Sequence, residues 1–352
     1  MDRRLVVLYT HPKPSSFVRK DLAIFKSDFD VLEFQFVPRH KVLLPWVFVL
    51  QGFYILLNAR RVDIFITQFA GYASFLPVFF AKLLGKPCLI ITGGTDCVAF
   101  PNIKYGNFSK PVLGWFTAQS LRHATALSSV HESLQFQAYG YDADSPRAQG
   151  YITWACADSS KDRVIYNGYE SGVFRLLDSV ERKPQSFVTV LANPQSRFAR
   201  NLKGLDVFIE LAILKPHAQF TVVGGPQGFE LEGAPKNVSF KPFASPDELC
   251  LEMNAHQFYV QLSLSEGFPN ALCEAMLCGC VPIVSHVAAM PFIVEDLGVI
   301  VAKRGAEYVM EALVDFGPLP RPELVRERII QRFPLEKRTA ELRQLVKDLC
   351  AS

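Results

Sequence analysis

The regular alternation of short apolar segments with segments of helical periodicity constrains the fold most strongly. In the first half of the chain, the apolar segments are residues 5–9, 31–36, 63–67, 88–92 and 124–128. Helical patterns lie between them, for example over residues 17–26 and 73–84. Strands that are apolar along their whole length must be buried on both faces. This order therefore predicts a parallel sheet that is covered by helices on both sides.

The second half of the chain repeats the same pattern. An apolar segment at 187–191 precedes a predicted helix over 204–214, in which Leu205, Phe208, Ile209 and Ala212 form an apolar stripe. A further strand follows at 219–223. We therefore predict an α/β protein with two doubly wound, Rossmann-like domains, residues 1–168 and 169–334, and a ligand-binding cleft between them. Ligands of such sheets bind at the carboxyl ends of the strands.

Composition excludes several classes of function. The chain has 352 residues and a formal net charge of +3, which is too weak a positive charge to indicate nucleic-acid binding. Its eight cysteines are scattered, and several of them lie in apolar segments. This is typical of reduced thiols in a cytoplasmic protein. Charged residues 2–4 lead directly into a predicted strand, so we expect no signal peptide.

Two glutamates, Glu266 and Glu274, lie eight positions apart across a predicted strand-to-helix junction. The strand is expected over 258–264 and the helix over 271–278, with Asn270 as its N-cap. The backbone N–H groups at such a helix start, together with the helix dipole, favour an anion. The pattern therefore fits a ligand in which a diphosphate joins two hydroxyl-rich rings, with one carboxylate for each ring.

The segment from Glu266 to Glu274 resembles the E-x7-E motif of the retaining GT-B glycosyltransferases, in particular glycosyltransferase family 4. The resemblance continues through the following segment, residues 275–284. It implies the GT-B fold, with a nucleotide-sugar donor on the second domain and an acceptor on the first. It also implies that a charged C-terminal helix, within 335–352, crosses back onto the first domain.

The resemblance further assigns roles to residues around the motif. Glu274 would accept hydrogen bonds from the ribose hydroxyls and Glu266 from the sugar hydroxyls. The backbone around the start of the helix would hold the diphosphate. The residues expected to form this part of the donor site are Gly267, Phe268, Asn270, Ala271 and Leu272.

A basic pair is expected to hold the donor diphosphate. Lys203, which we place at the start of the helix over 204–214, matches the family lysine. Its arginine partner is either Arg197 or Arg200, and we slightly favour Arg197. A cation at a helix N-terminus is unfavourable, which indicates a functional role for Lys203. Fixed cations would stabilise the negative charge that develops on the departing nucleoside diphosphate.

Other loops that follow predicted strands complete the expected site. Asp96 follows the strand at 88–92 and is either a sugar-hydroxyl acceptor or local acid/base, or the aspartate of an Asx-turn. Gly225 and Phe243 are expected beside the nucleobase, although simple turn chemistry explains them equally well. On the acceptor side, Ser15 and Ser16 stand where many relatives have glycines. Asp142 and Asp144 form a D-x-D pattern, which binds metal in a different glycosyltransferase fold, but here the pattern lies in a loop and does not end a strand. We therefore predict neither a metal nor another cofactor.

The apolar segment over 42–57 has two interpretations. It is shorter than the ~20 residues that a membrane-spanning helix needs, and Arg60 and Arg61 follow it. We expect either a buried helix of the α/β layer or a helix that contacts a membrane surface with its arginines near lipid phosphates.

The sequence thus predicts a retaining, metal-independent hexosyltransferase that uses a UDP- or GDP-sugar. Its acceptor would be a saccharide or a lipid-linked saccharide, as in cell-surface polysaccharide or glycolipid synthesis. The protein would be cytoplasmic, with peripheral contact at the inner face of the membrane. Two alternatives are a catalytically silent nucleotide-sugar-binding partner of another glycosyltransferase and a nucleotide-sugar epimerase on the same fold.

Overall fold

The computed structural model describes residues 3–13 and 15–351, except for the side chains of Ser16 and Lys41. It divides into two compact units. Unit 1 comprises residues up to 138, 146–167 and from 336 onward, and unit 2 comprises 139–145 and 168–335. The chain therefore passes from unit 1 to unit 2 one residue before the predicted boundary, and segment 139–145 is an addition to unit 2 that the sequence did not indicate.

Unit 1 contains a five-stranded parallel sheet with the strand order β2-β1-β3-β4-β5. The strands are β1 (Val6–His11), β2 (Asp30–Gln35), β3 (Ile64–Gln68), β4 (Cys88–Thr92) and β5 (Ala126–Ser129). Every residue of β1, β3, β4 and β5 is buried, as the continuous apolar segments predict. A two-stranded ribbon, β6 (Gln137–Ala138) and β7 (Ala148–Gln149), lies outside this sheet.

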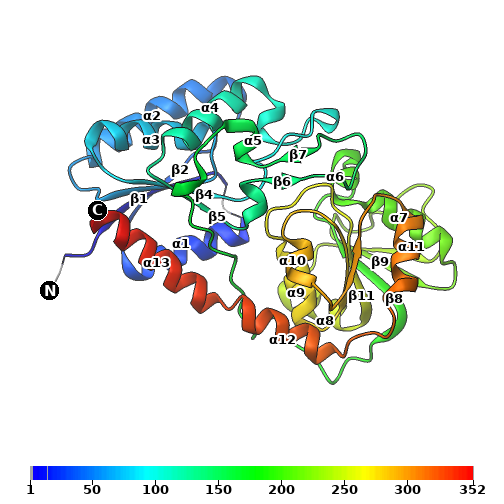
Figure 1. Cartoon of the computed structure of the whole chain (residues 1–352). Coiled ribbons are helices and arrows are strands. Elements are labelled where there is room, and N and C mark those ends of the chain that lie inside the picture. The colour runs from blue at the N-terminus through cyan, green and yellow to red at the C-terminus, as the bar shows by residue number, and fades with distance from the viewer. Residues whose placement is uncertain (1–2, 14, 352) are drawn as a thin grey trace. The chain divides into compact units, whose positions relative to one another are not determined.

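Helices cover both faces of the sheet of unit 1 (Figure 1). The helices α2, α3 and α4 lie on one face and α1 and α13 on the other. The bounds of the helices in this unit are α1 (Ser16–Asp28), α2 (Leu44–Asn58), α3 (Tyr72–Leu84), α4 (Pro111–His123), α5 (Tyr151–Ala155) and α13 (Leu335–Ala351). The last helix of the chain is thus part of unit 1, as predicted.

A buried ion pair fixes α13 to the rest of unit 1. The Arg338 guanidinium donates to both carboxylate oxygens of Asp21, at 2.8 and 2.7 Å, and to the carbonyls of Ile165 and Tyr166. Both side chains of the pair are almost completely buried, at 4% and 1% exposed. The pair therefore joins the first helix, the residues just before the chain leaves unit 1, and the last helix.

Unit 2 contains a six-stranded parallel sheet with the order β10-β9-β8-β11-β12-β13. Its strands are β8 (Lys183–Val190), β9 (Gln219–Val223), β10 (Val238–Lys241), β11 (His256–Gln261), β12 (Val281–Ser285) and β13 (Val299–Val301). Its helices are α6 (Arg197–Lys203), α7 (Leu205–Leu214), α8 (Pro246–Asn254), α9 (Asn270–Leu277), α10 (Met290–Val294), α11 (Ala306–Asp315) and α12 (Pro322–Arg332).

The strand order of each sheet locates its topological switch point. This is the position between two adjacent strands at which the strand order reverses. In unit 1 this point lies between β1 and β3, and in unit 2 it lies between β8 and β11. In open α/β sheets, the loops at the carboxyl ends of such strands form the ligand crevice. The loops that follow β8 and β11 are therefore expected to form the donor site.

Candidate functional site

The helix α6, which follows β8, is joined directly to the loop that follows β11. The Leu264 amide donates to the Leu202 carbonyl at 2.8 Å. Gly204 adopts a φ of +73°, and a Cβ at this position would lie 2.2 Å from the Leu262 carbonyl oxygen. Only glycine therefore fits between α6 and α7. This close approach brings the end of α6 to the segment that carries Glu266.

Lys203 is the last residue of α6, so its predicted place at a helix start is wrong. The sequence indicates a loop over residues 192–202, but its second half belongs to a short helix that begins after Ser196, whose side chain accepts a hydrogen bond from the Ala199 amide. A cation is favourable at a helix C-terminus. The helix dipole therefore gives no indication of a role for Lys203, and only the contacts of its side chain can indicate one.

Those contacts centre on Glu266. The Lys203 ammonium lies 2.7 Å from Oε1 of Glu266, and the same oxygen accepts hydrogen bonds from Gln261 and Ser263, both at 2.7 Å. The Glu266 side chain is 10% exposed, whereas that of Lys203 is 38% exposed. Glu266 is thus held in one orientation by three donors. Its partner Lys203 keeps access to solvent and to a ligand.

The sequence did not single out Gln261 and Ser263 as partners of Glu266. Gln261 ends β11, and its side-chain oxygen accepts a hydrogen bond from the buried hydroxyl of Tyr259 at 3.0 Å. Polar residues at the carboxyl end of a buried strand are the signal that could have indicated them. Together they connect the sheet to the carboxylate through a continuous series of hydrogen bonds.

Both motif glutamates act electrostatically on Tyr259. Burial raises the pKa of the Tyr259 phenol well above its ordinary value, and the negative charges of Glu266 and Glu274 raise it further. Glu274 lies one turn into α9, as predicted, and is partly exposed. Both carboxylates of the motif are thus near enough to Tyr259 of β11 to act on its phenol.

Helix α9 begins at Asn270, and Pro269 is the N-cap in place of the predicted Asn270. The Asn270 side chain instead accepts a hydrogen bond from the Tyr169 hydroxyl at 2.8 Å. Among residues 3–13 and 15–351, no side chain caps this helix end. The amides of Ala271 and Leu272 therefore remain for water or an anionic ligand.

Gly267 and Phe268 lie in the loop just before α9, and both are buried. The Phe268 ring packs against the rings of Tyr169 and Phe333, with centroids 6.4 and 5.1 Å away. Its side chain therefore supports the loop from within the core of unit 2. Only the backbone at this position is available to a ligand.

The two candidate arginines lie at different places on α6. Arg200 donates to the carbonyl of Pro194 at 3.1 Å, so its guanidinium supports the loop that follows β8. Arg197 is the first residue of α6 and is exposed, and it has no hydrogen-bond or ion-pair partner within the described part of the chain. The structure thus leaves Arg197 available to an anion.

The loops that follow β9 and β10 are also joined. The Phe243 amide donates to the Gly225 carbonyl at 3.0 Å, and the Phe243 ring is 68% exposed. Gly225 has a φ of +88°, and a Cβ there would lie 2.7 Å from the Pro194 ring. Gly225 is therefore needed for packing against the loop that follows β8, and Phe243 presents an aromatic face to solvent.

Asp96 has the environment of the Asx-turn alternative. Its carboxylate accepts hydrogen bonds from the amides of Gly93, Gly94 and Ala70, at 3.0–3.1 Å, and the residue is 1% exposed. Burial raises the pKa of this carboxyl, while the three N–H donors lower it. Asp96 thus ties the loop that follows β4 to the loop that follows β3, as the Asx-turn alternative expects.

The acceptor-side serines stand at the start of α1, just beyond the carboxyl end of β1. Ser15 is the N-cap residue, yet its hydroxyl makes no capping bond and has no partner among the described residues. The side chain of Ser16 lies outside the described part of the chain. Ser15 therefore offers one unsatisfied hydroxyl at the switch point of unit 1.

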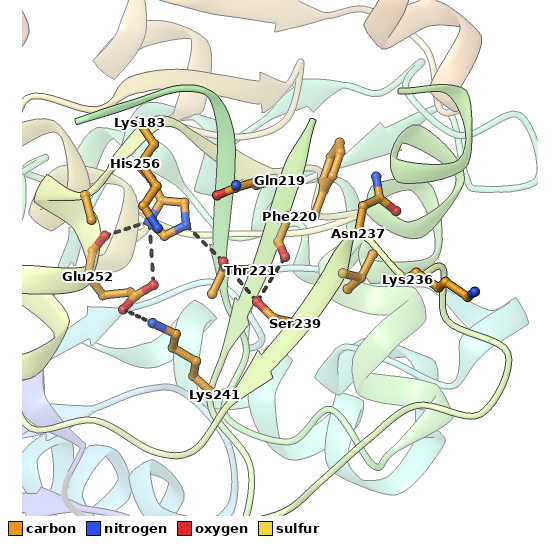
Figure 2. Close-up of a pocket in the computed structure, with 12 residues that line it drawn as sticks. Lys183, Gln219, Phe220, Thr221, Lys236, Asn237, Ser239, Lys241, Glu252 and His256 are labelled. Atoms are coloured by element: carbon orange, nitrogen blue, oxygen red, sulfur yellow. Dashed lines mark hydrogen bonds and ion pairs between the residues drawn. The ribbon is translucent and has the colours of Figure 1, made fainter. Parts of the chain in front are cut away.

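A polar cavity of about 440 Å³ lies at a different edge of unit 2 (Figure 2). Lys183, Gln219 and His256, the first residues of β8, β9 and β11, contribute to its lining. Its Lys241 forms an ion pair with Glu252. Burial lowers the pKa of His256. Because Lys183, Gln219 and His256 lie at the amino ends of their strands, the cavity is separate from the loops at the carboxyl ends that carry Lys203 and Glu266.

Residues 195–316 match a family model described as glycosyl transferases group 1. This segment contains Lys203, both candidate arginines and both motif glutamates. No curated protein matches the chain in a sequence comparison. The family match therefore supports a glycosyltransferase through unit 2.

Solved structures extend the likeness to the whole chain. Sucrose-phosphate synthase from Thermosynechococcus elongatus is 17% identical with a TM-score of 0.72, covering 99% of this chain and 100% of that chain. HepE from Anabaena, solved in complex with UDP, is 14% identical with a TM-score of 0.74, covering 98% and 100%. The catalytic domain of starch synthase IV from Arabidopsis thaliana, bound to ADP and acarbose, is 10% identical with a TM-score of 0.65, covering 99% and 100%.

At these identities the likeness shows the fold. The chain therefore has the two-unit α/β architecture of the GT-B fold. Together with the match of its second unit to the group 1 glycosyltransferases, this fold supports a glycosyltransferase.

Proposed function

We propose that this protein is a retaining glycosyltransferase that moves a hexose from a UDP- or GDP-sugar to a hydroxyl of a saccharide or lipid-linked saccharide. The observation that carries the proposal is the ion pair between Lys203 and Glu266 at the β8/β11 switch point, in the segment just before the uncapped start of α9. This arrangement combines a cation, helix N–H groups and a fixed carboxylate. These are the groups that recognise a sugar diphosphate.

Unit 2 would bind the donor in three parts. The amides of Ala271 and Leu272 and the Lys203 ammonium would hold the diphosphate. Lys203, Gln261 and Ser263 all bond to one oxygen of Glu266, Oε1. The other oxygen, Oε2, would therefore accept hydrogen bonds from the hydroxyls of the transferred sugar. Glu274, one turn into α9, would accept the ribose hydroxyls.

Arg197 is the better candidate for the second cation. It is exposed and has no partner among the described residues, whereas Arg200 donates to loop carbonyls. Phe243, whose ring is exposed beside Gly225, would stack on the nucleobase, because an aromatic face accepts a base of any kind.

The chemistry that this site supports is stabilisation of a leaving group. As the bond between the anomeric carbon and the β-phosphate oxygen breaks, negative charge develops on that oxygen, and Lys203 and Arg197 would stabilise it. The acceptor hydroxyl would attack from the same face as the leaving phosphate, which would take the hydroxyl proton. The anomeric configuration is then retained without a protein nucleophile.

Unit 1 offers a matching acceptor region. A pocket of about 230 Å³ lies at the carboxyl ends of β1, β2 and β3, and residues such as Phe36, Phe69 and Tyr72 line it. The apolar character of these side chains favours an acceptor with a lipid portion over a free saccharide. The unsatisfied Ser15 hydroxyl stands just beyond the end of the same β1 strand.

The role of Glu274 can be tested by binding. We expect Glu274→Ala to abolish detectable UDP or GDP binding in calorimetry, because the ribose hydroxyls lose their charged acceptor. The unliganded variant should melt like the parent protein. Stabilisation of the parent at ligand about 100-fold above its Kd should be about 2.7 kcal/mol.

Glu311→Ala is the matched control for this experiment, because Glu311 is an exposed helical glutamate of the same unit. This control should bind nucleotide like the parent protein. Unchanged nucleotide affinity of the Glu274 variant would contradict the assignment.

Transfer is also expected to proceed without a divalent metal ion. The cations of α6 and the amides of α9 already supply positive charge to the diphosphate, so a metal has no required part in departure of the nucleotide. Nucleotide release with extracted lipid acceptor should therefore be the same with and without EDTA. Loss of turnover in EDTA that added Mg²⁺ or Mn²⁺ restores would rule out this scheme.

A further inference from the structure

The helix α2 exposes a continuous apolar stripe. Trp46, Phe53 and Leu57 are 67%, 62% and 80% exposed, and Val49, Leu50 and Leu56 are also exposed. The six positions follow the spacing i, i+3, i+4, i+7, i+10 and i+11, so they form one face along the whole helix. The expectation of a buried helix is therefore wrong for this face.

The opposite face of α2 carries a buried polar side chain. Gln51 is fully buried, and its amide donates to the Ala73 carbonyl at 2.8 Å. Ile55, one turn later, is also buried. A surface helix in water normally turns its polar residues outward and its apolar residues inward. Helix α2 has the reverse arrangement, which is favourable only if its outer face meets an apolar medium.

The neighbouring helices extend this surface. Phe79 and Leu83 of α3 and Val112 and Trp115 of α4 are all more than half exposed. An apolar pocket of about 380 Å³ lies between α3 and α4, and Phe75, Phe79 and Trp115 contribute to its lining. The three helices lie side by side on one face of the sheet (Figure 1). We call their outer surface the α2–α4 face.

The α2–α4 face has no acidic residue. From position 34 to 131 the only acids are Asp63 and Asp96. Asp63 lies outside the three helices and pairs with Arg3, and Asp96 is buried. Exposed basic residues of the same region flank or lie on the face: Arg39, Arg60, Arg61, Lys82 and Lys110. The surface is therefore apolar at its centre and positive at its borders.

We propose that the α2–α4 face docks onto an anionic lipid bilayer, with α2 lying in the plane of the interface. With 15 residues, α2 is about 22 Å long, which suits an interfacial position. Within the described residues, every helix is too short or too polar to traverse a bilayer. Tryptophan favours the level of the lipid headgroups, and lysine and arginine are attracted to anionic lipids.

The charge pattern distinguishes the bilayer from a second copy of the chain. A symmetric dimer through this face would bring the arginines of both copies together, and the face supplies no acid to pair with them. Such like-charge contacts are strongly unfavourable. An anionic bilayer satisfies both the apolar stripe and the basic border.

Vesicle co-sedimentation tests the proposal without any sugar nucleotide, so it can fail independently of the proposed transferase activity. The full chain should bind vesicles of phosphatidylcholine with 30 mol% phosphatidylglycerol, and it should bind pure phosphatidylcholine vesicles at least about tenfold more weakly. High salt should weaken the binding to the anionic vesicles. Equal binding to both vesicle types would overturn the proposed anionic partner.

Substitutions on the exposed stripe test the docking face. Phe53→Glu and Leu57→Glu should each weaken vesicle binding at least about tenfold, since each removes an apolar side chain that the lipid would cover and adds a charge that the lipid repels. Arg60→Ser and Arg61→Ser should each weaken it about fivefold. Ile213→Glu and Leu251→Glu are matched controls, because these residues are also apolar and at least half exposed but belong to unit 2. Both control variants should bind vesicles like the parent protein.

Fluorescence locates the inserted helix. In a chain that carries Trp115→Phe and Trp154→Phe, Trp46 is the remaining tryptophan, and its emission should shift to the blue on anionic vesicles and be quenched by brominated lipid. Unchanged vesicle binding of the Phe53 and Leu57 variants, or unquenched Trp46, would overturn the proposal. So would a dimer in analytical ultracentrifugation that these variants dissociate, if the parent chain fails to bind vesicles.

Discussion

Replacing Lys203 with alanine should lower the rate of sugar transfer by about a hundred- to a thousand-fold, which corresponds to about 2.7–4 kcal/mol of transition-state stabilisation. Lys203 is the last residue of α6. Its ammonium lies 2.7 Å from the Glu266 carboxylate, and its side chain is 38% exposed. Its attraction to the β-phosphate grows as negative charge develops there. The loss should therefore fall mainly on kcat rather than on KM for the donor.

The rate of nucleotide release tests this prediction, and a melting curve of the variant shows whether it is folded. Glu266 keeps its bonds to Gln261 and Ser263 in the variant, so the fold should survive. Lys236→Ala removes an exposed lysine at the polar cavity of Figure 2 and should leave the rate unchanged. A Lys203 variant that retains its rate within about threefold would exclude the proposed role.

The same assay identifies the second cation. Arg197→Ala should lower kcat by a factor similar to that of the lysine variant. Arg200→Ala should act mainly through the melting temperature, because its guanidinium holds the Pro194 carbonyl. If Arg200→Ala lowered kcat and Arg197→Ala did not, Arg200 would be the cation that binds the diphosphate.

Replacing Arg338 with methionine should destabilise unit 1 by about 3–5 kcal/mol. The change leaves the Asp21 carboxylate, which is 1% exposed, without the guanidinium that bonds to both of its oxygens. It also removes the donor to two backbone carbonyls. For a unit of this size, we expect the melting temperature to fall by about 6–20 °C.

Two further variants make this test specific. Arg343→Met removes another arginine of α13, whose ion pair with Asp28 is partly exposed, and it should cost less than about 1 kcal/mol. The double change Asp21→Leu with Arg338→Met should recover much of the loss, because no buried charge is then stranded. An Arg338 variant that melts like the Arg343 variant would show that the buried pair contributes little.

The sequence predicted the elements whose apolar residues are continuous or regularly spaced. The strands β4 and β9 have the expected bounds, and α7 begins one residue after its predicted start. These segments are buried along their whole length or along one stripe. Their local pattern is therefore sufficient to fix both the type of the element and its approximate ends.

Features that depend on distant contacts could not be predicted in the same way. The short helix α6 was missed because its residues are mostly polar and too few for a periodic pattern. The Lys203–Glu266 pair joins residues 63 positions apart, and it depends on the close approach of Gly204 to Leu262. The place of Asp96 is set in part by the Ala70 amide, which lies in another loop.

The exposure of α2 illustrates the same limit. Its sequence is apolar on nearly every side, so periodicity could not show which face is buried. The tertiary structure resolves this through Gln51, which is buried because it bonds to the Ala73 carbonyl of α3. The sequence alone is therefore compatible with both a buried helix and a membrane-contacting helix.

The pairing of Asp21 with Arg338 also has a consequence for synthesis of the chain on the ribosome. Asp21 emerges early, but its partner is translated after every residue of unit 2. Nascent unit 2 can complete its sheet while unit 1 still lacks α13 and holds an unneutralised carboxylate at the place where α13 will pack. Maturation of unit 1 must therefore wait for the last stretch of translation.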